Sequence, residues 1–130
     1  MISVKTKEVF DLRIAIRDAI KNSTIDTWSH SLLKLGHSRL DWTGGQENNW
    51  PKINENIYFE VFKDPNDETN HTFKFLLHTL HGYHLDESTY ACMHRELLYM
   101  LMAHFNAQLS SYTIKGPKFN KHQADVMDKV

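Results

Sequence analysis

The sequence predicts an α+β domain with an N-terminal helical hairpin, a small antiparallel sheet and a long C-terminal helix. Apolar residues recur at helical spacing between residues 7 and 35, an aromatic and β-branched run occupies residues 57–62, and another helical pattern follows residue 86. The 130 residues are enough to bury a core without disulfides. We expect one compact domain over residues 1–116 and a tail over 117–130. An all-α bundle is the alternative.

Two helices are expected before residue 37. The first covers about residues 7–21, where the residues that share one face are Val9, Leu12, Ile16, Ala19 and Ile20. The second starts near Ser23 or Thr24, and its apolar residues are Ile25, Trp28, Leu32 and Leu35. Gly36 stands where a left-handed helix C-cap belongs. Because the connection is short, the two helices should form an antiparallel hairpin.

The middle of the chain mixes loop and strand patterns. Residues 46–56 are mostly polar and predict a long loop, whereas residues 57–62 are typical of a strand. Turn-forming residues follow at 64–67. Residues 69–82 fit either a strand paired with 57–62 or a helix that ends at Gly82. We prefer the helix, because one face would then carry Phe73, Leu76, Leu77, Leu80 and Tyr83.

A long helix is expected from near Asp86 or Ser88 to about Leu109. Its apolar stripe includes two histidines, His94 and His104, ten residues apart. At about 1.5 Å per residue the two rings are too far apart to bind one metal ion. We interpret both as core residues whose ring nitrogens find hydrogen-bond partners.

Several observations indicate a cytoplasmic protein. A single cysteine cannot build a disulfide framework and favours a reducing compartment. The N-terminus shows no apolar segment typical of a secretory signal. The longest apolar run, residues 97–103, is far shorter than a membrane span. No contact with membranes is therefore expected.

Motifs for catalysis are missing from the sequence. It has no Gly-x-Ser-x-Gly elbow, phosphate-binding glycine loop or His-Glu-x-x-His motif. Cys92 is followed four residues later by Glu96, whose charge would raise the pKa of the thiol and weaken it as a nucleophile. We therefore nominate no catalytic residue and lean against an enzyme.

A histidine cluster is the one candidate metal site. His78, His81 and His84 lie three residues apart and could bind zinc, either in a metal-binding protein or in a metal-dependent hydrolase. Their spacing matches no standard zinc motif, and a solvated polar face is the preferred interpretation. No cofactor is expected, and zinc is the alternative.

The charge distribution points to a protein partner. The net charge of -1 combines +3 over residues 1–40, -5 over 41–70, -1 over 71–114 and +2 over 115–130. The acidic middle also carries aromatic residues, and interfaces favour aromatic anchors ringed by charge. The candidate partner-binding residues are Trp42, Glu47, Trp50, Glu55, Tyr58, Glu60, Asp64, Asp67 and Glu68.

We therefore expect a small protein-binding module. Its most concrete form is an immunity- or antitoxin-type inhibitor that binds a basic partner such as a nuclease toxin. The alternative for this segment is an ordinary charged loop whose aromatic residues pack inward. Nucleic-acid binding is disfavoured, because its only support is a lysine-containing tail after residue 114. Self-association is a third option.

Overall fold

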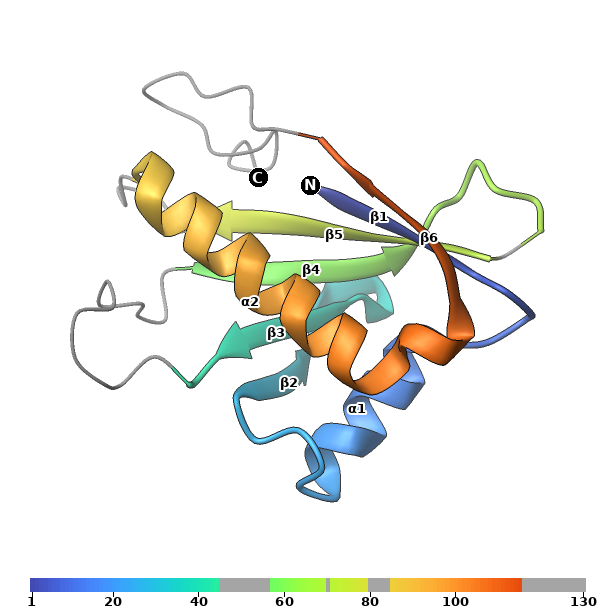
Figure 1. The fold of residues 1–130 in the computed structure, drawn as a ribbon, viewed down its shortest axis with the longest axis horizontal. Coiled ribbons are helices and arrows are strands. Elements are labelled where there is room, and N and C mark those ends of the chain that lie inside the picture. Colours follow the sequence, from blue (N-terminus) through green and yellow to red (C-terminus); the bar gives the residue numbers. More distant parts are fainter. Residues whose placement is uncertain (45–56, 70, 80–84, 116–130) are drawn as a thin grey trace.

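A computed structural model describes residues 1–44, 57–69, 71–79 and 85–115. They form one antiparallel sheet of six strands in the order β2-β3-β4-β5-β1-β6, with two α-helices on one of its faces (Figure 1). The strands are β1 (Ile2–Thr6), β2 (Trp28–Leu32), β3 (Ser38–Trp42), β4 (Ile57–Lys63), β5 (Thr72–Thr79) and β6 (Leu109–Ile114). The helices are α1 (Leu12–Lys21) and α2 (Glu87–Phe105), and short 3-10 turns cover Lys34–Gly36 and Asn106–Gln108.

Both helices begin at an aspartate that caps them. The Asp11 carboxylate accepts hydrogen bonds from the backbone N–H groups of Arg13 and Ile14, at 3.1 and 3.4 Å. The Asp86 carboxylate accepts from the backbone N–H of Thr89 at 2.7 Å. Each cap satisfies N–H groups that the first helical turn leaves without a partner.

The predicted N-terminal helical hairpin is wrong. Residues 23–35 form a turn, strand β2 and the start of a 3-10 turn instead of a second helix. Residues 27–31 are Thr, Trp, Ser, His and Ser, all weak helix formers, and β2 pairs along its whole length with β3. Gly36 does adopt a positive φ of 78°, but it ends a 3-10 turn and not an α-helix.

The sheet is also larger than predicted. Residues 2–6 form β1, so the first helix begins at Leu12 and not near residue 7. Residues 72–79 form β5, so the preferred helical interpretation of residues 69–82 is wrong. An all-α bundle is excluded by the same strands. Strand β4 and helix α2 lie where a strand and a long helix were expected.

The core lies between the helices and one face of the sheet. Alternate residues of β4 are fully buried there, namely Ile57, Phe59 and Val61. The Phe59 ring lies 5.9 Å from the Trp28 ring of β2 and 5.1 Å from the His94 ring of α2. Leu12 and Ile16 of α1 belong to the same buried cluster. Phe59, on β4, therefore contacts both the edge strand β2 and helix α2.

The two histidines of α2 have different outcomes. His94 is buried, and its Nδ1 donates a 2.8 Å hydrogen bond to the backbone carbonyl of Tyr90, which confirms its predicted core position. His104 is exposed, so the same prediction was wrong for that residue. Neither of the two helices in the described ranges is long and apolar enough to cross a membrane.

We expect Phe59→Ala to lower the free energy of unfolding by about 3–5 kcal/mol, because it removes a buried ring and leaves a cavity. Tyr99→Ala serves as the control, since Tyr99 is 71% exposed on α2 and should cost no more than about 0.5 kcal/mol. Urea unfolding monitored by circular dichroism measures both. Equal losses would contradict the assignment of Phe59 to the core.

Candidate functional site

The face of the sheet opposite the helices is the first candidate site. Among the described residues, no helix covers this face, which we call the open face. Cross-strand partners point to the same side of a sheet. The pairs Arg39↔Glu60 and Tyr58↔His78 therefore place polar and aromatic residues of three adjacent strands together on it.

Glu60 lies at the centre of the open face, between two histidines. The Nδ1 atom of His37 donates to Oε2 of Glu60, and Nε2 of His78 donates to Oε1 at 2.8 Å. His37 immediately precedes β3, Glu60 is on β4 and His78 is on β5. The side chain of Glu60 is 18% exposed and that of His78 only 8%. One carboxylate thus links three neighbouring segments.

Aromatic stacking extends this cluster. The ring of Tyr58 stacks on that of His78 at 5.0 Å, and the guanidinium carbon of Arg39 lies 4.0 Å from the centre of the Tyr58 ring. Asp41 holds the Arg39 guanidinium through two hydrogen bonds of 2.8 and 2.9 Å. These side chains are held in place by several partners each, so the surface they form is preorganised.

A second stack flanks the first. The ring of His37 lies 5.1 Å from that of Phe62 and nearly parallel to it, at 15°. Phe62 is half-buried and follows Glu60 by two residues on β4. We call the residues of the two stacks and their ion pairs the open-face cluster: His37, Arg39, Asp41, Tyr58, Glu60, Phe62 and His78.

The cluster fixes the charge of two of its groups at neutral pH. Burial acts to raise the pKa of Glu60, but the hydrogen bonds and charges of His37 and His78 outweigh it and hold that pKa below its usual value. Burial raises the pKa of Tyr58, with Glu60 and Asp41 adding to the rise and Arg39 opposing it. Glu60 is therefore ionised and Tyr58 is protonated.

Chemically, the cluster can bind a partner or orient a histidine. Because Glu60 engages Nδ1 of His37, that hydrogen bond fixes the orientation of the imidazole ring. The cluster does not form a metal site: no group of three or more metal-ligating side chains comes together in the parts of the chain that the structure describes. The His78 ring is hydrogen-bonded to Glu60, and His81 and His84 lie outside the described residues. Zinc binding by those histidines stays a prediction.

The predicted partner-binding residues fall into separate places. Tyr58 and Glu60 belong to the open-face cluster. Trp42 pairs with Trp28 of β2 and packs against the core on the helix side. Glu47, Trp50 and Glu55 lie outside the described residues. The candidate set therefore does not form one continuous surface.

The remaining acidic residues form the turn between β4 and β5. The Asp64 carboxylate lies 3.6 Å from Nζ of Lys74. The carboxylate of Asp67 accepts hydrogen bonds from the hydroxyls of Thr69 and Thr72, which lower its pKa strongly. Glu68 is exposed. We call residues 64–68 the acidic turn, in which the Asp67 carboxylate stays ionised well below neutral pH.

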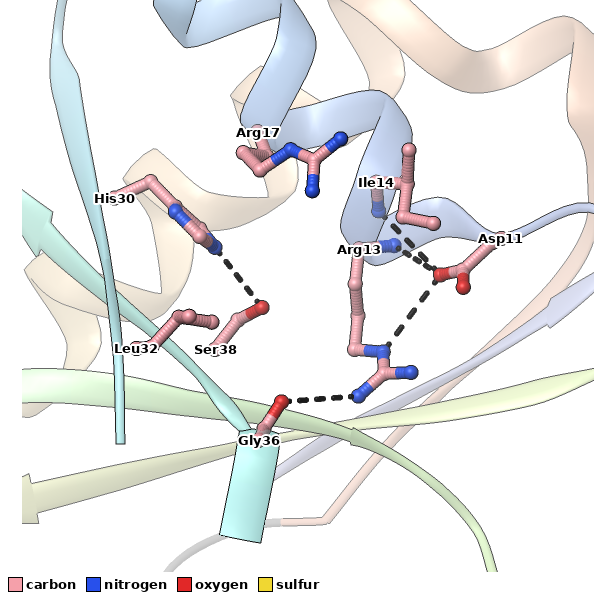
Figure 2. Close-up of a pocket in the computed structure, with 8 residues that line it drawn as sticks. All are labelled: Asp11, Arg13, Ile14, Arg17, His30, Leu32, Gly36 and Ser38. Carbon is pink, nitrogen blue, oxygen red and sulfur yellow. Dashed lines mark hydrogen bonds and ion pairs between the residues drawn. The ribbon is translucent and has the colours of Figure 1, made fainter. Parts of the chain in front are cut away.

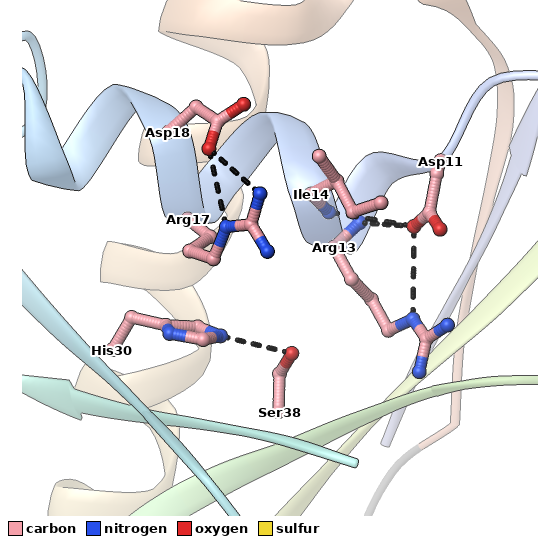
Figure 3. A network of polar contacts seen from close by, with 7 residues as sticks. All are labelled: Asp11, Arg13, Ile14, Arg17, Asp18, His30 and Ser38. Carbon is pink, nitrogen blue, oxygen red and sulfur yellow. Dashed lines mark hydrogen bonds and ion pairs between the residues drawn. The ribbon is translucent and has the colours of Figure 1, made fainter. Parts of the chain in front are cut away.

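A pocket on the helix side is the second candidate site (Figure 2). It has a volume of about 120 Å³ and lies between α1, β2 and the start of β3. Arg13 and Arg17 enter it from α1, and His30 and Ser38 from the sheet. Nε2 of His30 and Oγ of Ser38 are 3.0 Å apart (Figure 3). Burial, followed by the charge of Arg17, lowers the pKa of His30, so this ring is neutral at pH 7.

Cys92 offers no reactive thiol. It is buried, and burial raises its pKa, with Glu96 adding to the rise and Arg95 opposing it. A thiol with a raised pKa is a weak nucleophile at neutral pH. This direction agrees with the interpretation of Cys92 from the sequence.

Comparisons with known proteins do not assign the chain to a family. No protein-family model, no curated protein and no solved structure matches it. The function has to be argued from the two sites themselves.

Sequence analysis missed most of both sites. His37, Arg39 and Asp41 were not nominated, although residues 39–42 alternate polar and apolar side chains as a half-buried strand does. Arg13 and Arg17 are four residues apart and therefore neighbours on a helix, which was a usable signal. Only the fold shows that His30 and Ser38 face them.

We expect Glu60→Gln to destabilise the protein by about 1–3 kcal/mol at pH 7, because it weakens two half-buried hydrogen bonds. The folded-state pKa of Glu60 is lowered, so its contribution is present above the ordinary value of 4.5 and is lost as the pH falls through the folded-state value. Urea unfolding between pH 7 and 3 should therefore show the wild type and the variant converging in acid. Asp26→Asn, at an exposed position, should show no such convergence. A difference that is constant with pH would contradict the role of the Glu60 charge.

Proposed function

We propose that the chain is a protein-binding module that docks a partner protein on the open face. The observation that carries this proposal is the open-face cluster, in which Tyr58, Arg39 and Phe62 are fixed by stacking and ion pairs on a sheet face that no described helix covers. The packing of the core, on the other face of the sheet, does not require a tyrosine, an arginine or a phenylalanine at these three positions.

The composition of the cluster suits an interface centre. Tyrosine and arginine are enriched among the residues that dominate binding energies. Their rings and guanidinium give large contact areas with a polar end. Because Arg39, Tyr58 and His78 already hold one another in the free protein, a partner would lose little free energy in ordering them.

The acidic turn suggests the charge of the partner. It follows β4 directly and carries three carboxylates at the edge of the molecule. An acidic rim speeds the encounter with a basic protein and disfavours acidic ones. The most concrete form of the proposal is an immunity- or antitoxin-type inhibitor of a basic toxin such as a nuclease. It would act in the cytoplasm, as the single cysteine favours.

The first test is site-specific photo-crosslinking in the native host. Ser31 is exposed and pairs with Arg39, so it lies on the open face beside the cluster. A photoreactive side chain placed at position 31 should give a covalent adduct with one defined protein, identified by mass spectrometry.

The same side chain at Met102, which is 51% exposed on α2, is the matched control and should not give that adduct. Identical adducts from both positions, or none from position 31, would rule out docking on the open face. Purified adduct partner then serves for affinity measurements, and Tyr58→Ala should raise its Kd by at least about tenfold, as expected for a residue at an interface centre.

The second test addresses charge. Glu68→Lys should slow association with the purified partner by about tenfold at low salt, and the effect should fade at high salt, because it reverses an exposed rim charge. Glu8→Lys makes the same charge change at another exposed position and should leave the rate unchanged. Stopped-flow association kinetics measures both. Equal slowing by the two variants would point to net charge alone and contradict a role for the acidic turn.

A further inference from the structure

The pocket beside α1 has a chemistry of its own, separate from the proposed protein-binding face. Ser38 points into this pocket, whereas its neighbour Arg39 belongs to the open face, so the two sites lie on opposite sides of the sheet. The pocket volume of about 120 Å³ is large enough for several water molecules. A small polar ligand could therefore occupy it without any rearrangement of the backbone.

Two arginines of α1 line this space. Arg13 and Arg17 lie four residues apart on α1, and like charges at this spacing destabilise a helix slightly. An anion bound between them would relieve that repulsion. Figure 2 shows the Arg13 side chain reaching from α1 to the Gly36 carbonyl, whereas the Arg17 side chain stays beside the helix at the other end of the pocket.

Part of the donor capacity of these arginines is unused among the described residues. Nη1 of Arg13 reaches the Gly36 carbonyl only at 3.5 Å. Nε of Arg13 is buried, lies 3.6 Å from the Asp11 carboxylate and makes no hydrogen bond. Arg17 is bonded through Nε and Nη2 to Asp18, and this pair is about half exposed on the outside of the helix (Figure 3). Exposed pairs of this kind are weak, so an anion in the pocket can compete with Asp18.

One carboxylate, that of Asp11, lines the pocket and lies 3.6 Å from Nε of Arg13, but it also accepts hydrogen bonds from the backbone N–H groups that begin α1. Asp18 is not among the lining residues, and its pair with Arg17 is about half exposed. His30 and Ser38 add two further groups that can donate to an oxygen. Four donor side chains around a small space match the several oxygen atoms of a phosphate group better than the two of a carboxylate.

We propose that this pocket binds the phosphate group of a small phosphate monoester. Arg13 and Arg17 neutralise its charge, and His30 and Ser38 donate hydrogen bonds to its oxygens. The organic part of the ligand lies against Ile14 and Leu32, two apolar side chains at the pocket that are 45% and 71% exposed.

Titration of the full chain with inorganic phosphate and with phenyl phosphate, followed by calorimetry and by backbone amide shifts, tests the proposal. Both should bind saturably, with shifts confined to α1, β2 and the start of β3, and phenyl phosphate should bind more tightly. Arg13→Gln and Arg17→Gln should each raise the Kd by about tenfold, the loss expected for one charged hydrogen-bond donor.

Lys21→Gln is the matched control, because it removes one positive charge from the same helix at an exposed position outside the pocket. It should change the Kd by less than about twofold, since exposed charges at a distance are screened. The Arg17 side chain is about half exposed and its pair with Asp18 is weak, so its variant should keep the wild-type melting temperature and report on binding alone. Absence of saturable binding, an equal effect of Lys21→Gln, or benzoate binding as tightly as phenyl phosphate would each overturn the phosphate assignment.

Discussion

Burial of a single face of the sheet against both helices is the constraint on which the rest of the molecule depends. Phe59 lies at its centre, in contact with Trp28 near one edge and with His94 of α2. Because strand residues alternate between the two faces of a sheet, each β4 residue that packs into the core places its neighbours on the opposite face. The position of Tyr58, Glu60 and Phe62 is thus decided by the burial of Ile57, Phe59 and Val61.

The polar side of the sheet is organised around one negative charge. Glu60 is paired with two histidines from the flanking segments, while Asp41 is paired with Arg39. On the open face, the carboxylates of Glu60 and Asp41 are therefore each paired with a histidine or an arginine. The acidic turn keeps most of the negative charge of the middle of the chain. On the helix side, Arg13 and Arg17 line the pocket together with Asp11.

The sequence predicted elements better than it predicted their arrangement. The strand at 57–62 and the long helix after residue 86 have propensity and periodicity in agreement, and both are present. Residues 23–35 and 69–82 carry apolar residues at spacings that fit a helix, yet both regions contain strands. Pairing of β2 with β3, and of β5 with β4 and β1, decided between the two, and such long-range hydrogen bonds leave little trace in a local pattern.

The make-up of the candidate sites also depends on strand pairing that a local sequence pattern does not reveal. Tyr58 and Glu60 were named from local composition, but Arg39 and His78 join them only through strand register. Trp42 fitted the same composition and faces the core, because its cross-strand partner is the buried Trp28. Composition locates residues along the chain, and the register decides which of them share a face.

The position of β1 inside the sheet affects how the chain can fold during synthesis. Ile2 pairs both with Phe75 and with Ile114, so β1 waits for partners that are made much later. Contacts of such high sequence separation slow folding. Until β5 and β6 leave the ribosome, both edges of β1 present unpaired backbone N–H and C=O groups, the condition under which nascent chains associate wrongly. A chaperone that shields β1 until the later strands are made would therefore act on this protein at its most vulnerable stage.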